Sequence, residues 1–391
     1  MVMSNSLAGA GLGAEGDERS VAERVRKLAD RLVRPTAPAR DRERRWDPEL
    51  FRELAEAGLA GALIPPELGG AGLTARETFA LLEGLGEGAR DPGLALAVTV
   101  HAVLTAVPLR AFGTAAQRER YLPGMADGSR LGALSLRQTQ HTGLAPTVTA
   151  RPAPVDGDGW VLTGELDLVA VAPEAHHFLV VAGHDGRGGR TAFFVDRETP
   201  GLQITDAGPA AMATCPWGRL VLHGCPVPET AVLGTVGGAA DEVEPLLAGL
   251  DWVFTSAPWL GVMRALTRDA VGEARERLLF GRPVAHDQSA RFTLADLAAR
   301  CELAAGLLYR AAERFDGAGG PAPRDAAAAR LFTASAARAV TEEAARLSGP
   351  FALTGDHLIE RAHRDALFFA ETGGGSGVLR PVVAASLLGV G

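Results

Sequence analysis

The sequence has few cysteines and few aromatic residues, and almost all of its basic residues are arginine. Its three cysteines, Cys215, Cys225 and Cys301, are odd in number and lack the spacing of a metal site. This argues against a disulfide framework and favours a reduced, cytoplasmic protein without a bound metal. Lys27 is the single lysine, and we interpret the excess of arginine, alanine and glycine as the composition of a GC-rich bacterial genome.

The charge and hydropathy of the chain also restrict its partners. The 39 basic and 47 acidic residues give a net charge of -8, and no basic stripe indicates binding to nucleic acid. Residues 93–109 are the most apolar run, which is short for a membrane span and predicts a buried core helix instead. His101 lies in this run, and we interpret it as a hydrogen-bonded core residue. The expected partner is therefore a small molecule or another protein chain.

Hydrophobic periodicity divides the 391 residues into four segments. Residues 1–18 are small and polar and are expected to form a flexible tail. Residues 19–130 and 236–391 carry apolar residues at helical spacing. Between them, residues 131–235 alternate short apolar runs with glycine and aspartate turns, as strands of a small barrel or sandwich do. Helices are expected over residues 20–32, 48–58, 74–85, 263–279 and 326–347.

The most specific motif joins two of the C-terminal helical patterns. It begins Arg277-Leu-Leu-Phe280-Gly281-Arg-Pro283 and continues to Gln288, and its glycine and proline are expected to end the preceding helix. The pattern Arg-x-x-Phe-Gly-x-Pro, with glutamine five residues beyond the proline, resembles the acyl-CoA dehydrogenase family. The stretches at 58–72, 157–164 and 360–365 resemble the same family, so the resemblance covers nearly the whole chain.

This resemblance implies an α+β fold with an N-terminal helical domain, a middle β-domain and a C-terminal four-helix bundle. It places Arg277, Phe280 and Gln288 against an FAD, largely that of a neighbouring subunit, and it implies a homo-oligomer, a dimer or a tetramer. The planar guanidinium of Arg277 suits a pyrophosphate because it donates paired hydrogen bonds. The alternative for Arg277 is an exposed side chain beside a helix turn. The charged residues Glu360-Arg361 and Arg364-Asp365 are interpreted as ion pairs that fix helix packing.

The sequence departs from the family at the catalytic base. Family members remove an α-proton from an acyl thioester with a carboxylate while the β-hydrogen leaves as hydride to the flavin. The loop that supplies this carboxylate reads Gly373-Gly374-Gly375 here, and Glu371 is the nearest acid before it.

Some family members carry the base on an earlier helix instead. In this chain, counting back from Gly261 puts Asp251 at that position, whereas counting forward from Gly249 puts Val253 there. An aspartate among apolar neighbours has a raised pKa, which suits a base, but Asp251 could equally cap a helix.

The segments that contact FAD in the family are also changed. Ser135-Leu136-Arg137, Gln140-His141-Thr142 and Leu168-Val169-Ala170 lack most of the hydroxyl, acidic and ring-stacking side chains, and Gly349-Pro350 replaces a glycine pair. The changed segments therefore argue against ordinary FAD binding, whereas Arg277 and Gln288 match the family's FAD-contacting motif and favour it.

Three functions follow from these residues. The favoured one is a biosynthetic enzyme that acts without redox chemistry, by cyclisation or elimination, on a polyketide-like substrate or an acyl thioester of CoA or an acyl carrier protein. Asp251, His141 and Arg137 would be its polar groups. The second is an FAD-dependent dehydrogenase with Glu371 or Asp251 as a relocated base. The third is a non-catalytic chain that forms a hetero-oligomer with an active dehydrogenase.

Overall fold

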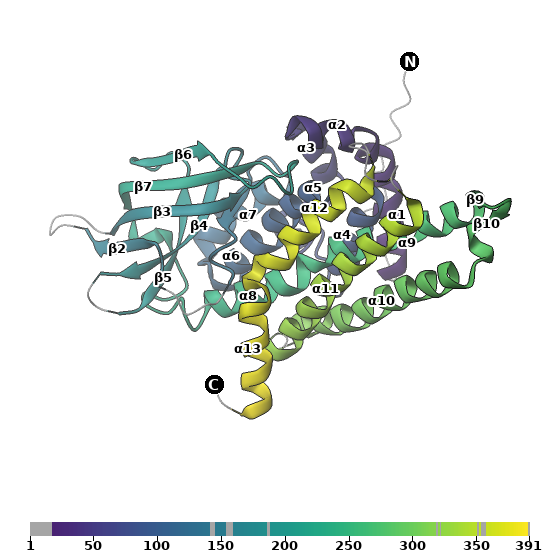
Figure 1. Ribbon diagram of the computed structural model, residues 1–391. Coiled ribbons are helices and arrows are strands. Elements are labelled where there is room, and N and C mark those ends of the chain that lie inside the picture. The colour runs from purple at the N-terminus through teal and green to yellow at the C-terminus, as the bar shows by residue number, and fades with distance from the viewer. Residues whose placement is uncertain are drawn as a thin grey trace, which may run out of the picture.

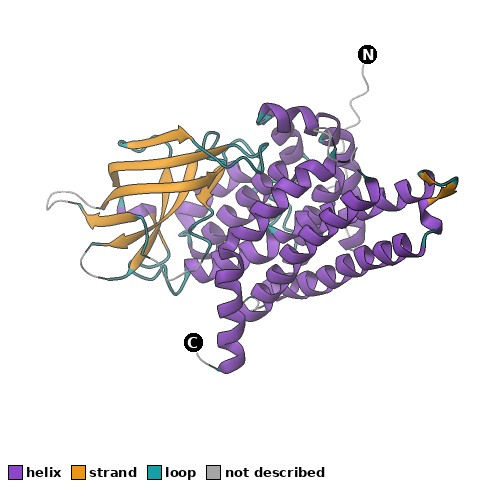
Figure 2. Ribbon diagram, viewed as in Figure 1, coloured by secondary structure: helices purple, strands orange, loops and turns teal. Residues whose placement is uncertain are grey.

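The computed structural model describes residues 18–140, 145–153, 159–185, 188–317, 320, 322–349, 352 and 357–389. Helices make up the first and last parts of this chain, and the strands gather at one end of the molecule (Figures 1 and 2). The helix-to-strand change falls between Ala126 and Gly132, and the return to helix falls between Leu233 and Val243. The order helical domain, β-domain, helical domain is therefore as predicted.

The N-terminal helices begin where local signals predict. Asp47 accepts a hydrogen bond from the Leu50 amide at 3.1 Å, and Thr74 forms a capping box with Glu77. The helices are α1 (Glu18–Leu32), α2 (Ala37–Glu43), α3 (Pro48–Glu56), α4 (Ala75–Ala89), α5 (Pro92–Thr99), α6 (Ala106–Phe112) and α7 (Ala115–Ala126). A π-helical turn, Val100–Thr105, joins α5 to α6 and carries His101.

The eight strands of the β-domain belong to one hydrogen-bonded sheet of order β6-β7-β3-β1-β4-β5-β8, in which β2 also pairs with β3 and β4. Most pairs are antiparallel, while β1 and β2 each run parallel to β4. The end of β1 lies beside the end of β3, with Leu134 opposite Ala170. The strands are β1 (Gly132–Ser135), β2 (Val148–Pro152), β3 (Trp160–Ala170), β4 (His177–His184), β5 (Arg190–Asp196), β6 (Leu202–Asp206), β7 (Trp217–Val227) and β8 (Val232–Leu233).

The C-terminal helices are α8 (Val243–Phe254), α9 (Ser256–Glu276), α10 (Gln288–Glu313), α11 (Pro323–Ser348), α12 (Leu358–Glu371) and α13 (Gly375–Leu388). The Ala-rich α11 is central and packs against the other five. The prediction that α9 continues to residue 279 is wrong, because the chain leaves it at Glu276 and forms a hairpin of β9 (Leu278–Leu279) and β10 (Arg282–Pro283). Phe280 and Gly281 turn this hairpin with φ values of 50° and 79°, at the far tip of the molecule (Figure 1).

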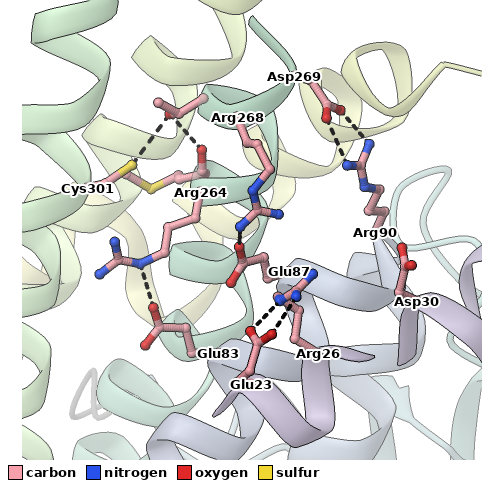
Figure 3. Close-up of polar contacts among 12 residues, drawn as sticks. Glu23, Arg26, Asp30, Glu83, Glu87, Arg90, Arg264, Arg268, Asp269 and Cys301 are labelled. Carbon is pink, nitrogen blue, oxygen red and sulfur yellow. Dashed lines mark hydrogen bonds and ion pairs between the residues drawn. The ribbon is translucent and has the colours of Figure 1, made fainter. Parts of the chain in front are cut away.

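The N- and C-terminal parts meet where α4 crosses α9. A Cβ atom on Gly261 would lie 2.1 Å from the carbonyl oxygen of Glu83, so the two backbones approach as closely as they do because this residue is glycine. Ion pairs flank the crossing, with Arg264 Nε 2.6 Å from Glu83 Oε1 and Arg268 paired with Glu87 (Figure 3). This contact fixes α9, and α8 immediately before it, relative to the N-terminal helices.

Two helical stretches, Pro92–Phe112 and Val243–Glu276, have the length and apolar composition of a membrane span, but 100% and 89% of their most apolar windows are buried inside the protein. They are therefore core helices of this fold. The apolar run at 93–109 accordingly has the buried position that its length predicts.

Of the charged residues of α12, Arg364 and Asp365 make ion pairs of the kind that the sequence suggests. Arg364 Nη2 lies 2.6 Å from Asp41 Oδ1 on α2, and Asp365 Oδ1 accepts hydrogen bonds from Arg364 Nε at 2.9 Å and from the Met212 amide at 2.8 Å. Met212 precedes β7, so this network joins all three parts of the chain. Its contacts are structural, as predicted.

Candidate active site

Asp251 is a buried acidic group at a place where the three parts of the chain meet. It lies inside α8 with 2% of its surface exposed, so the interpretation of Asp251 as a helix cap is wrong. Its carboxylate accepts hydrogen bonds from two hydroxyls: Thr139 Oγ1, just after β1, lies 2.6 Å from Oδ2, and Thr255 Oγ1, after α8, lies 2.9 Å from Oδ1. Burial raises the pKa of Asp251, and Arg330, Thr139 and Thr255 counteract this.

The glycine loop after α12 lies directly against this carboxylate. A Cβ atom at Gly373 would lie 3.2 Å from Asp251 Oδ2. Trp252 Nε1 donates a hydrogen bond to the carbonyl oxygen of Gly373 at 2.9 Å, which fixes the loop on α8. Asp251 on α8 and the loop at Gly373 are therefore adjacent in this structure, and of these two residues only Asp251 carries a carboxylate.

Apolar side chains surround the free side of Asp251. The space between them is small, about 10 Å³, which is room for about one water molecule. The rings of Trp259 and Phe369 stack on one side of it, 5.0 Å apart at an interplanar angle of 25°. The other lining residues are Pro92, Leu96, Leu136, Met212, Thr255, Pro258, Phe368 and Thr372.

The remaining predicted site residues lie apart from Asp251 or outside the described chain. Arg137 is exposed and lines a separate, polar cavity of about 110 Å³ on the β-domain. Glu371 is exposed at the end of α12 and does not line the space beside Asp251. His141 lies outside the described residues. The sequence analysis grouped Arg137 with Asp251 as polar groups of one site, but the structure places them beside separate cavities.

The residues predicted to contact FAD lie at the other end of the C-terminal helices. Arg277 Nη1 donates a hydrogen bond to the carbonyl oxygen of Leu347 at 2.6 Å, so it joins the hairpin to the end of α11. Phe280 is 98% exposed at the hairpin tip, and Gln288 is exposed at the first residue of α10. The β9–β10 hairpin and the start of α10, where these residues lie, are at the opposite end of the molecule from the β-domain (Figure 1).

Two places in this structure bear on FAD binding. Arg137, whose guanidinium is the kind of donor that a pyrophosphate binds, lines the cavity on the β-domain together with Gln140 and with the acids Glu165, Asp167 and Glu244. Gly373, Gly374 and Gly375 all have positive φ, and their bare backbone allows a flat ring to approach closely. The flavin ring needs more room than the space beside Asp251, which holds about one water molecule. These residues are the ones that would hold the group.

This three-part order of helical domain, β-domain and helical domain is that of the acyl-CoA dehydrogenase fold. The family model of the acyl-CoA dehydrogenase N-terminal domain matches residues 15–129, and that of the C-terminal domain matches residues 253–388. The chain is a member of the acyl-CoA dehydrogenase family.

Two of its relatives are named for different acyl carriers, CoA and a peptidyl-carrier protein. It is 30% identical to benzylmalonyl-CoA dehydrogenase of Aromatoleum aromaticum over 370 residues, which covers 94% of this chain and 97% of the relative. It is 28% identical over 336 residues to L-prolyl-[peptidyl-carrier protein] dehydrogenase of Pseudomonas fluorescens, covering 85% and 88%. The solved structure of butyryl-CoA dehydrogenase from Megasphaera elsdenii has a TM-score of 0.89 at 27% identity and covers 96% of this chain and 99% of that one.

The sequence analysis did not find three residues around Asp251. Thr139 and Thr255 bond its carboxylate, and Arg330 on α11 donates to Thr255 Oγ1 at 2.8 Å. A signal for Arg330 was present, because it is a charged residue on the buried side of an otherwise alanine-rich helix, where charge is rare unless it has a partner.

Proposed function

We propose that this chain is an acyl thioester dehydrogenase in which Asp251 replaces the family's usual loop glutamate as the base. The observation that carries the proposal is the position of the Asp251 carboxylate, 3.2 Å from where a Cβ atom of residue 373 would stand. The carboxylate of Asp251 thus lies beside Gly373, the loop position at which the family resemblance implies a glutamate. The relatives named above are dehydrogenases, which favours this activity over the non-redox reaction that the sequence analysis preferred.

The chain's own residues support the first step, removal of the α-proton. A carboxylate whose pKa is raised by burial is a stronger base than one in water. The hydroxyls of Thr139 and Thr255 each lie within hydrogen-bond distance of one carboxylate oxygen and of one backbone carbonyl, so each carboxylate oxygen keeps at least one lone pair for the proton. The apolar residues around it leave room for about one water molecule, and in this proposal the proton that Asp251 accepts comes from the substrate. FAD, when bound, supplies the hydride acceptor in this chemistry.

The substrate in this proposal is an acyl group carried by CoA or by a carrier protein. Relatives of both kinds cover most of the chain, and the prolyl carrier-protein relative supports a role in biosynthesis. The exposed apolar side chains of the hairpin and of α10, which include Leu278, Phe280 and Phe292, support a homo-oligomer that buries them. Light scattering of the purified protein tests this, and a monomer at all concentrations would contradict it.

The test compares Asp251→Asn with Glu371→Gln, and with Glu342→Gln on the exposed side of α11 as a matched control. Each variant is loaded with FAD, mixed anaerobically with acyl thioesters of CoA and of carrier protein, and followed by bleaching of the flavin absorbance. We expect D251N to slow bleaching by a factor of about 100 or more, while the other two variants keep the wild-type rate.

Two results would contradict the proposal in different ways. Normal bleaching in D251N together with loss in E371Q would make Glu371 the base. A wild-type protein that stays colourless with added FAD would remove the dehydrogenase activity itself and return the non-redox reaction to first place.

A further inference from the structure

We propose that Arg330 is the positioning residue of this site, which fastens the glycine loop and sets the charge of Asp251 through the hydroxyl of Thr255. The inference rests on the proposed role of Asp251 as base. Arg330 lies on α11, and 0% of its surface is exposed. It touches neither the space beside Asp251 nor the carboxylate itself, so its action is indirect.

The guanidinium of Arg330 bridges two elements that are distant in sequence. On one side, Nη1 donates to Thr255 Oγ1 at 2.8 Å. On the other, Nη2 donates to the carbonyl oxygen of Phe369 at 2.7 Å and to Thr372 Oγ1 at 3.0 Å. The guanidinium carbon also lies 3.6 Å from the centre of the Phe369 ring, within cation–π range. Arg330 thereby ends α12 and holds the loop that carries Gly373 against α8.

The same guanidinium is the charge that acts on Asp251. Thr255 Oγ1 accepts from Arg330 and lies 2.9 Å from Asp251 Oδ1, so one hydroxyl separates the two charges. The other groups that act on the pKa of Asp251 are hydroxyls, and the charge that acts on Arg330 is Asp251. Among the described residues no further charged group acts on the pKa of Asp251, either from α8, α11, α12 and the turn after β1 or from α5 and α9, which also line the space beside it. A buried carboxylate needs such a cation to stay ionised.

This geometry gives the direction in which the pKa of Asp251 changes when Arg330 is removed. Burial raises the pKa of Asp251, and the nearby positive charge lowers it. Removing the charge therefore moves the pKa further up, and Asp251 becomes a base only at higher pH. A residue that served only to pack α12 would produce no such displacement, because its loss would lower the rate equally at every pH.

The test uses the FAD-loaded enzyme and compares wild type, Arg330→Met and Arg330→Lys. We expect the acidic limb of the kcat/KM profile to move to higher pH by about one unit or more in R330M, and to return toward wild type in R330K, which keeps the charge. Arg40→Met is the matched control, because Arg40 is also fully buried and pairs with Asp91 at 2.9 Å without contacting the site. It should lower stability and leave the profile in place.

A second measurement does not depend on turnover. Infrared difference spectra between acidic and neutral pH report the band of a protonated carboxyl group, and the band that D251N lacks belongs to Asp251. This band should titrate at higher pH in R330M than in wild type. An unshifted band and an unshifted profile in R330M would overturn the inference. A shifted band in a protein that dehydrogenates nothing would uphold the Arg330–Asp251 coupling and reject the proposed function instead.

Discussion

His101 provides a pH-dependent test of the core. It is fully buried, its Nε2 lies 2.9 Å from the carbonyl oxygen of Met125, and its Nδ1 accepts a hydrogen bond from the Gly132 amide at 3.1 Å. Both ring nitrogens are thus satisfied in the neutral form, with the proton on Nε2. Protonation would require Nδ1 to donate toward an N–H group. Burial is the main cause that lowers the pKa of His101 from 6.5 to about 4.

The change in the free energy of unfolding follows from the linkage between folding and proton binding by His101. Above pH 6.5 the ring is neutral in both the folded and the unfolded state, so it contributes no pH dependence. As the pH falls from 6.5 toward about 4, the unfolded state binds a proton that the folded state refuses, and the free energy of unfolding decreases. A difference of two to three pKa units corresponds to a loss of about 3 kcal/mol by the lower end of this range.

Urea unfolding of wild type and of His101→Asn across this pH range measures the loss. We expect the variant to be less stable than wild type near neutral pH, because it loses packing and a hydrogen bond, and the difference to shrink by about 3 kcal/mol toward pH 4. The difference between the two curves removes the contributions of other titrating groups. A constant difference at every pH would refute the assignment of a depressed pKa to His101.

Three further changes test the packing and the surface. Arg40→Met should cost about 3–5 kcal/mol in urea unfolding, because it leaves the buried carboxylate of Asp91 without its partner. Gly261→Ala should cost about 1–3 kcal/mol by the same assay, because the new methyl group meets the carbonyl oxygen of Glu83. Phe280→Ser should change the stability of an isolated subunit by less than about 0.5 kcal/mol, yet promote dissociation in sedimentation experiments, since this ring is exposed on the subunit and available to a partner.

The parts of the fold that depend on local signals could be predicted from the sequence. Asp47 and Thr74 start helices because their side chains bond amides three residues ahead. The strand region follows from alternation and turn residues in the same way. The end of α9 could not be predicted, because residues 277–279 fit a helix pattern, and the hairpin after it depends on bonds such as that from Arg277 to Leu347, seventy residues away.

Of the candidate site, only the residue whose own sequence surroundings are unusual could be predicted. Asp251 stood out as an acid in an apolar stretch, although two alignments of its segment were possible. Thr139 and Thr255 carried little signal of their own, because hydroxyls bond their own backbone in many helices and turns. Their role comes from the meeting of the β1 turn, α8 and α11, which tertiary packing alone produces.

The position of Asp251 also changes the meaning of the missing loop glutamate. A glutamate at 373 would have its Cβ atom 3.2 Å from Asp251 Oδ2, so the chain would hold two carboxylates in one buried place. Like charges that close disfavour ionisation of one another, and the cation near them, Arg330, could balance only one. When the carboxylate is on α8, glycine at position 373 therefore avoids this repulsion. Taken by itself the Gly373-Gly374-Gly375 stretch predicts a lost activity, whereas beside Asp251 it is what a relocated base requires.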